Sequence, residues 1–173
     1  MKLISASGAW PVEAVTIMHR IAAKVEADPG YSARLHFTQV RPDATTADAL
    51  AQSAAKIAET VTTAGIIVFT SSGSTARRVA RERPGVPMLV LTPSHKTARR
   101  VALLWGAHAV HTKDIGSFEE MIAKGKRMAL RQGFGTAGAK LIALAGVPFG
   151  TPGATNLLHV VTLTGEELKG REG

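Results

Sequence analysis

The chain has 173 residues, of which 45% are hydrophobic, 20% charged and only 5% aromatic. These proportions exclude wholesale disorder, and they predict a core of Ala, Val, Ile and Leu, which suits helices packed on a buried parallel sheet. The absence of cysteine excludes disulfide bonds, thiolate metal sites and a cysteine nucleophile. The apolar runs are too short for a membrane span or a secretory signal, which predicts a cytoplasmic protein without a membrane partner.

The formal net charge of +8 favours polyanionic partners such as nucleic acid or phosphorylated metabolites. The basic residues are spread along the chain, and their densest group is Arg77, Arg78, Arg81 and Arg83. A solvated helix face explains this group without any ligand, and no recognised nucleic-acid motif accompanies it. The sequence therefore predicts no nucleic-acid partner.

The first predicted element is an amphipathic helix near the N-terminus. Pro11 suits its first turn, where the missing N–H is not needed, and apolar residues recur at helical spacing as far as Val25. The sequence Asp-Pro-Gly at 28–30 ends the helix, and the stretch that follows shows no clear period. The expected organisation is an N-terminal helical segment, a linker and a second domain, with the boundaries 1–30, 31–44 and 45–173.

After the linker, strands and helices alternate along the chain. Thr45 with Asp48 and Ser117 with Glu120 have the spacing of capping boxes, and Ser94 is a further N-cap. The predicted helices are 45–61, 74–83, 94–106 and 117–132, and the predicted strands are 65–70, 87–91, 107–111, 140–144 and 157–163.

This alternation predicts an α/β fold with three α/β/α layers around a mostly parallel five-stranded sheet. The last connection differs from the others. A parallel return needs a crossover of about a dozen or more residues that usually includes a helix. Residues 146–156 contain three glycines, two prolines and no helical period. The last strand is therefore predicted to run antiparallel to its neighbour, and the polar tail, 165–173, to fray.

The most informative segment for function is 70–75, with the sequence Thr-Ser-Ser-Gly-Ser-Thr, between a predicted strand and a predicted helix. Ligands of open α/β sheets collect at the carboxyl ends of strands, and hydroxyls beside helix N-terminal N–H groups suit a phosphate. Neither the lysine of a Walker loop nor the glycines of a dinucleotide fingerprint are present. A plain polar turn with Ser72 or Ser74 as N-cap explains the segment equally well.

A second candidate is the glycine- and proline-rich loop 146–156, whose glycines allow the backbone to approach a ligand. It leaves a strand that is predicted to be parallel to the first, so both loops are expected to open on the same edge of the sheet. A binding loop and a plain connection are equally open interpretations.

The histidines and acidic residues predict no metal site and no catalytic residue. His108 and His111 are three apart in a predicted strand and therefore face opposite sides. No Ser, His and acid set stands out as a catalytic triad.

Several separated segments together resemble one family. They are, in chain order, Ala6–Val15, Phe69–Arg77, Arg83-Pro84, Thr92-Pro93, Thr97–Arg99, Leu104–Gly106, Ala145–Pro148 and Gly153–Asn156. In this order they resemble the pyruvate kinases: the first segment is similar to the one that opens the last helix of the catalytic barrel, and the others to the C-terminal α/β domain. The resemblance spans nearly the whole chain after its first few residues.

The resemblance implies a glycolytic enzyme that moves a phosphoryl group from phosphoenolpyruvate to ADP with Mg²⁺ and usually K⁺. Its reacting groups lie in a barrel that precedes this region, and none of the barrel motifs occurs here. Residues 1–4 also differ from the family at that place. The expectation is therefore a piece of a pyruvate kinase without kinase activity or a cofactor of its own. The alternative is a free-standing α/β enzyme or binding protein for a phosphorylated metabolite.

The resemblance further implies an allosteric site and an oligomer. In many members a phosphorylated sugar such as fructose 1,6-bisphosphate places one phosphate in the loop matching 70–75 and reaches the loop matching 146–156; other members respond to AMP or sugar monophosphates. Lys124 corresponds to a phosphate-binding arginine of some members, and Ser117 stands near the place of an aromatic partner. The residues expected to bind the effector are Thr70, Ser71, Ser72, Gly73, Ser74, Thr75, Lys124, Gly150, Thr151 and Gly153. The family implies a homotetramer, with pairs of these domains forming a dimer.

Overall fold

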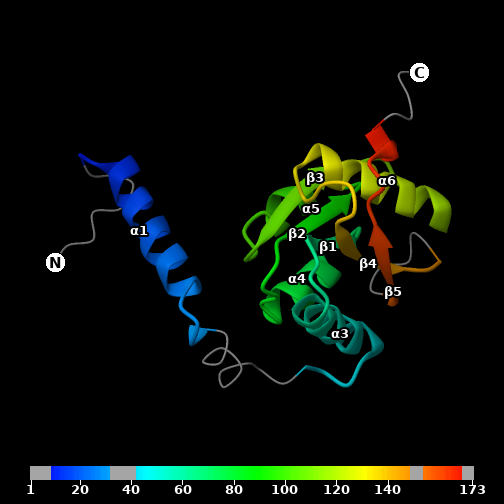
Figure 1. Cartoon of the computed structure of the whole chain (residues 1–173), viewed down its shortest axis with the longest axis horizontal. Coiled ribbons are helices and arrows are strands. Elements are labelled where there is room, and N and C mark those ends of the chain that lie inside the picture. Colours follow the sequence, from blue (N-terminus) through cyan, green and yellow to red (C-terminus); the bar gives the residue numbers. More distant parts are fainter. Residues whose placement is uncertain (1–8, 32–41, 149–153, 169–173) are drawn as a thin grey trace. The chain divides into compact units, whose positions relative to one another are not determined.

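A computed structural model describes residues 9–31, 42–148 and 154–168. The chain divides into two compact units, residues 1–41 and 42–173, and each is described by itself (Figure 1). Most of the predicted linker lies outside the described residues.

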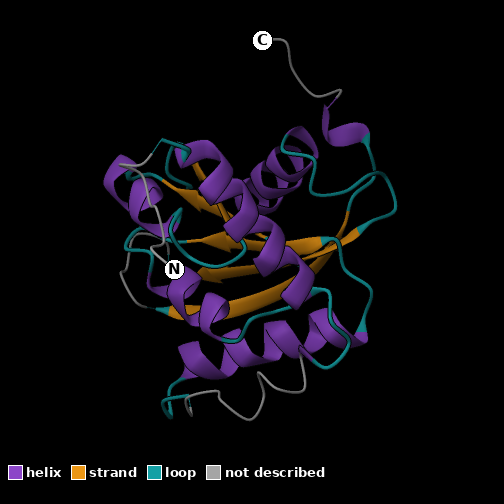
Figure 2. Cartoon of the chain, turned by 90° about the vertical axis from the view of Figure 1, so that its left-hand side faces the viewer, coloured by secondary structure: helices purple, strands orange, loops and turns teal. Residues whose placement is uncertain are grey.

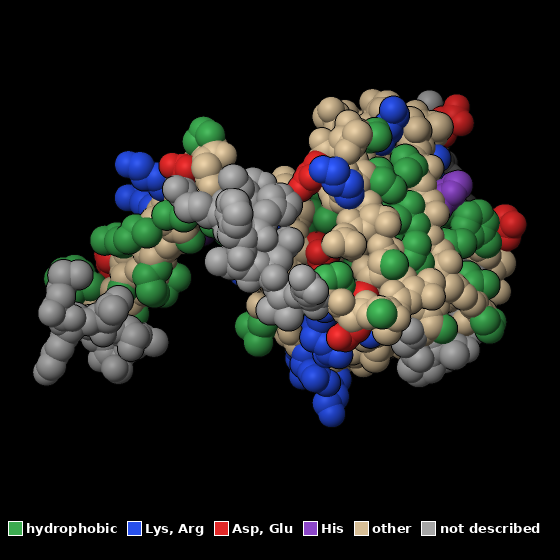
Figure 3. All heavy atoms as spheres, turned by 90° about the horizontal axis from the view of Figure 1, so that it is seen from below, with side chains coloured by type: hydrophobic (Ala, Val, Ile, Leu, Met, Phe, Trp, Pro, Cys, Tyr) green, Lys and Arg blue, Asp and Glu red, His purple; other side chains and the backbone are tan. Residues whose placement is uncertain are grey.

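The helix α1 of the first unit spans Pro11–Glu26. Proline occupies its first turn, the acidic Glu13 lies near the positive end of the helix dipole, and Lys24 lies near the negative end. No residue of α1 is buried, and its apolar side chains form an exposed stripe (Figure 3). The large members of this stripe are Val12, Val15, Ile17, Met18, Ile21 and Val25, between 46% and 72% exposed.

The second unit is a five-stranded mixed sheet with helices between the strands. The strands are β1 Gly65–Phe69, β2 Met88–Thr92, β3 Ala107–His111, β4 Lys140–Gly146 and β5 Thr155–Thr162. The helices are α3 Thr46–Thr60, α4 Ser74–Arg81, α5 His95–Val101, α6 Phe118–Arg131 and the short 3₁₀ helix η1 Glu166–Leu168. The strand order is β3-β2-β1-β4-β5, in which β1 to β4 are parallel and β5 is antiparallel to β4. The predicted α/β fold and the reversed last strand are both confirmed.

Helices cover both faces of the sheet, as predicted (Figure 2). Successive residues of a strand point to opposite faces, so Ile66 and Val68 of β1 pack with α3, α4 and α5. Ile67 and Phe69 of the same strand pack on the other face with Met121 of α6. All residues of β1 and β2 are buried, which explains why these strands are continuous apolar runs in the sequence.

The N-caps predicted for α3, α5 and α6 are confirmed. The Thr45 hydroxyl accepts from the Asp48 N–H at 3.2 Å at the start of α3, and Ser94 accepts from the Thr97 N–H at 3.2 Å at the start of α5. The Ser117 hydroxyl likewise accepts from the Glu120 N–H at the start of α6. Local side chains therefore fix where these helices begin.

A buried ion cluster joins α3 to α4. Asp48 is only 1% exposed and accepts from Arg81 at 2.6 Å, from Arg78 at 3.3 Å and from the Thr45 hydroxyl at 2.6 Å. The Thr45 hydrogen bond, followed by those from the two arginines, holds the pKa of Asp48 below its ordinary value against the opposing effect of burial. The arginines that make the sequence look basic thus serve partly to bind helices together.

On the face shown in Figure 3, Lys and Arg side chains stand in separate groups, with Asp and Glu side chains among them. This arrangement agrees with the interpretation of the +8 charge as dispersed over the chain rather than gathered for one polyanion.

Predicted boundaries differ from the structure most clearly at α5 and at the tail. The helix predicted for 94–106 ends at Val101, because the last turn tightens into bonds such as Leu104 N–H to the Val101 carbonyl, and Gly106 then takes a φ of 65°. The tail was predicted to fray from residue 165, but η1 is held there by an ion pair between Lys126 and Glu167. Burial opposes ionisation of Glu167, yet Lys126 and the Thr164 N–H lower its pKa to about 2.

Candidate functional site

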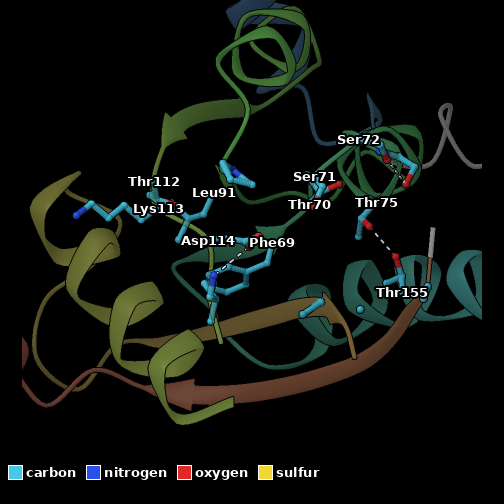
Figure 4. A pocket seen from close by; sticks show the side chains of 16 residues that line it. Phe69, Thr70, Ser71, Ser72, Thr75, Leu91, Thr112, Lys113, Asp114 and Thr155 are labelled. Carbon is cyan, nitrogen blue, oxygen red and sulfur yellow. Dashed lines mark hydrogen bonds between the residues drawn. The ribbon is translucent and has the colours of Figure 1, made fainter. Parts of the chain in front are cut away.

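The sheet topology places one cavity at the carboxyl ends of the parallel strands. From β1 the chain passes to β2 and β3 on one side, then returns to β4 on the other. Such a switch of direction leaves a crevice beside the first strand, which is where ligands bind in open α/β sheets. The cavity lies there, and Figure 4 shows it. It is lined by Phe69, Thr70, Ser71, Ser72, Ser74, Thr75, Leu91, Pro93, Thr112, Lys113, Asp114, Ile115, Ala145, Gly146, Ala154 and Thr155.

The bend at 70–75 is shaped by one threonine and one glycine. The buried Thr70 hydroxyl accepts from the Gly73 N–H at 2.9 Å and closes the bend. Gly73 has a φ of 84°, which only glycine adopts readily, and a Cβ there would lie 2.8 Å from Cγ1 of Val101. The Thr97 hydroxyl donates to the Ser71 carbonyl at 2.8 Å and fixes the bend to α5. The bend is therefore held by its surroundings on both sides.

The N-terminus of α4 supplies hydrogen-bond donors to this bend. Gly73 is the N-cap and offers no side chain, so the interpretation of Ser72 or Ser74 as an ordinary N-cap is wrong. Thr70 takes the Gly73 N–H, and the Ser72 hydroxyl takes the Ser74 N–H at 3.3 Å. The first four N–H groups of a helix have no partner within it, and among the described residues those of Thr75 and Ala76 have no acceptor either, so both could donate to a ligand.

The two predicted loops meet through a pair of buried hydroxyls. Oγ1 of Thr75 lies 2.6 Å from Oγ1 of Thr155, and both side chains line the cavity (Figure 4). The two ends of the second loop are joined by the Asn156 side-chain amide, which accepts from the Val147 N–H at 2.8 Å and donates to the Val147 carbonyl. The 70–75 segment and the described ends of the loop 146–156 therefore lie at the same edge of the sheet.

Replacing Thr75 by valine should lower the free energy of unfolding by about 1–2 kcal/mol, because the buried Thr155 hydroxyl then loses its partner. The double variant Thr75→Val, Thr155→Val should lose clearly less than the sum of the two single variants. Urea unfolding of the four proteins in this cycle measures the coupling. Strictly additive losses would show that the two hydroxyls do not stabilise each other.

The wall opposite the hydroxyls is the segment Thr112–Ile115, which follows β3. Figure 4 shows the Lys113 side chain directed away from Thr70 and Thr75. Lys124 of α6 lies behind this wall, where its ammonium donates to the carbonyls of Lys113 at 3.0 Å and Asp114 at 3.1 Å.

The structure brings five of the ten predicted binding residues together at the cavity. The side chains of the 70–75 segment that line the cavity belong to Thr70, Ser71, Ser72, Ser74 and Thr75. Gly73 and Lys124 are absent from the described lining: Gly73 shapes the bend, and Lys124 holds the opposite wall. Gly150, Thr151 and Gly153 lie outside the described residues.

The wall segment Thr112–Ile115 was not among the residues predicted for the site, although the carboxyl end of a third parallel strand falls on the same edge of the sheet as the others. Thr155 lies within the candidate loop 146–156 but was not singled out, because its contact with Thr75 depends on the antiparallel register of β5.

The cavity has the size of one small polar group. Its volume is about 60 Å³, whereas a single water needs about 10–15 Å³ and a pocket for a whole small ligand about 300–1,000 Å³. Hydroxyls and free helix N–H groups in such a space suit a phosphate.

Among the described residues no group of three or more His, Cys, Asp or Glu side chains is placed to hold a metal ion. His108 contacts Gln132 beyond α6, and His111 stacks on His95 of α5, so the two face opposite sides of β3 as predicted. In the part of the chain that the structure covers, no helix has both the length and the apolar character needed to cross a membrane.

Comparison with known proteins points to one family. A family model described as "Pyruvate kinase, alpha/beta domain" matches residues 48–161. The chain is 41% identical to a pyruvate kinase of Methylorubrum extorquens over 162 residues, 94% of this chain and 34% of that protein. It is 37% identical to one of Agrobacterium vitis (90% and 33% covered) and 34% identical to one of Geobacillus stearothermophilus (96% and 28% covered). The chain thus spans about a third of the length of the curated relatives it matches.

Proposed function

The chain belongs to the pyruvate kinase family, whose α/β domain it matches over residues 48–161, and from this we propose that it is the regulatory domain of a longer pyruvate kinase. In this proposal the domain binds a phosphorylated sugar or nucleotide and contacts other subunits. Phosphoryl transfer from phosphoenolpyruvate to ADP in cytoplasmic glycolysis would belong to the longer polypeptide.

One observation carries the proposal: a phosphate-sized cavity at the switch point of the sheet is lined by hydroxyls and by the N-terminus of α4. The N–H groups of Thr75 and Ala76 would donate to the phosphate, and the helix dipole adds about 0.3–1 kcal/mol of attraction. The described ends of the loop 146–156 line the same cavity through Gly146, Ala154 and Thr155, and in this proposal the loop would contact the remainder of the ligand.

The described residues contain no group of three or more His, Cys, Asp or Glu side chains placed to hold a metal ion, so none of them is assigned to the Mg²⁺ or K⁺ of the family's reaction. No step of phosphoryl transfer is therefore assigned to this chain, whose own part is to hold an anion without transforming it.

The subunit contact is supported by β5, which pairs only with β4 and forms one edge of the sheet. Val160 on this strand is 41% exposed, and an open edge of this kind pairs readily with another chain. A dimer of this chain, within a tetramer of the longer protein, would cover it.

Isothermal titration of the 173-residue chain with fructose 1,6-bisphosphate, glucose 6-phosphate and AMP tests the binding role. The variant Ser72→Asp places a carboxylate on the exposed bend and should abolish binding of every phosphate that the wild type binds, while leaving the helix start intact. Ser53→Asp, an equal charge change at an exposed position of α3 outside the cavity lining, is the matched control. If Ser72→Asp bound as tightly as the wild type, the binding site would not be at this bend. If the wild type bound none of the three compounds, the proposed binding function would be wrong.

A further inference from the structure

Lys124 is a cation whose side chain is only 11% exposed. Its ammonium lies 3.0 Å from the Lys113 carbonyl, 3.1 Å from the Asp114 carbonyl and 3.2 Å from Oε1 of Glu120. An ammonium has three donors, and these three acceptors use all of them. Lys124 therefore has no donor left for a phosphate in the cavity.

Glu120, one turn earlier on α6, binds the same backbone segment at Gly116, after the two carbonyls of Lys113 and Asp114 that Lys124 binds. Its Oε2 accepts from the Gly116 N–H at 2.9 Å, while its own N–H is capped by Ser117 at 3.1 Å. The Gly116 N–H, followed by Lys124, holds the pKa of Glu120 below its ordinary value, so the carboxylate is ionised at neutral pH. The backbone from 113 to 116 is thus fastened to α6 at three points.

We propose that Lys124 and Glu120 are positioning residues that hold the segment Thr112–Ile115 as a fixed wall of the cavity, and that Lys124 does not contact the bound anion. This inference rests on the proposed function, since it assigns the cavity to a phosphorylated ligand. The segment carries the cavity-lining Asp114 and forms the side opposite the hydroxyls of 70–75. A wall that moves would widen the cavity beyond the size of one phosphate.

The variant Glu120→Ala separates positioning from direct contact, because the two roles predict changes of opposite sign. If Lys124 bound the phosphate, removing a neighbouring carboxylate would free the ammonium and tighten binding. If the pair positions the wall, the loss of the Gly116 and Lys124 contacts should weaken binding. We expect the dissociation constant for AMP or fructose 1,6-bisphosphate, whichever the wild type binds, to rise about threefold to tenfold.

Glu119→Ala is the matched control, since it removes the same charge one residue away, from a side chain that makes none of these contacts with 113–116; its affinity should stay within about twofold of the wild type. Lys124→Met, which keeps the apolar stem, should weaken binding as Glu120→Ala does. Tighter or unchanged binding by Glu120→Ala would overturn the proposal.

Amide hydrogen exchange without ligand gives a second readout. In Glu120→Ala and Lys124→Met the N–H groups of 113–116 should exchange faster than in the wild type, while those of the central strand β1 stay protected. Unchanged exchange at 113–116 would overturn the positioning role. If the wild type binds none of the probes, the proposed function fails, and the exchange rates alone decide whether the pair holds this segment.

Discussion

Replacing Asp48 by alanine is expected to lower the free energy of unfolding by about 3 kcal/mol. The carboxylate is 1% exposed and joins three donors from two helices, so its removal leaves Arg78 and Arg81 without their shared acceptor. The two arginine side chains are 28% and 29% exposed and regain some water, which keeps the loss at the lower end for a broken buried pair. Urea unfolding monitored by circular dichroism measures the change.

The exposed ion pair between Lys56 and Glu59 on α3 is the control for the Asp48 variant. These side chains lie 3.0 Å apart but are 75% and 36% exposed, so Lys56→Ala should change stability by no more than about 0.5 kcal/mol. An Asp48 loss as small as that of Lys56 would show that the buried cluster does not stabilise the unit.

The same carboxylate should make stability depend on acid. Because the folded-state pKa of Asp48 is lowered, its contribution is present above the unfolded-state value of about 3.8 and is lost as the pH falls through the folded-state pKa. The wild type should therefore lose more stability than Asp48→Ala when the pH is lowered from 5 to about 3. Parallel pH profiles of the two proteins would contradict this linkage.

The second large effect is expected from Gly73→Ala, with a loss of about 3 kcal/mol. Part of the loss comes from the φ of 84°, which costs an alanine about 1–2 kcal/mol. The rest comes from crowding, since the new Cβ would lie 2.8 Å from Val101 and 3.3 Å from Thr97. The displaced bend would also lose affinity for any phosphate bound at 70–75.

Gly106→Ala separates strain from crowding in this prediction. Gly106 has a φ of 65°, but nothing lies within 4 Å of its added Cβ, so its loss should be only about 1 kcal/mol. Thermal unfolding of both variants gives the comparison. If Gly73→Ala and Gly106→Ala lost the same free energy of unfolding, α5 would accommodate the new Cβ at residue 73 without additional loss of stability.

Local signals made most of the fold predictable from the sequence. Thr45 and Ser94 mark helix starts through bonds within their own first turns, which need no tertiary context. The reversal of β5 followed from the composition of the connection before it, because a chain without a crossover helix has no route to a parallel return.

The features that sequence missed depend on contacts between distant segments. At η1 the tail is held by Glu167, which pairs with Lys126 on α6 and accepts from the N–H groups of Thr164 and Gly165. The family resemblance implied Lys124 as a phosphate ligand, and the structure adds that its ammonium donates to carbonyls ten and eleven residues earlier, a contact that the sequence does not reveal. The contact between Thr75 and Thr155 likewise joins residues eighty positions apart.

The bond pair between Asn156 and Val147 has a consequence for how this family can vary. The side-chain amide of Asn156 makes two hydrogen bonds to the backbone of Val147, at the point where β4 and β5 separate. The pairing of β4 with β5 is therefore fixed as far as Val147 and Asn156. Because this bond pair and the β4–β5 register lie outside residues 149–153, substitutions in that stretch are expected to leave the pairing of β4 with β5 unchanged.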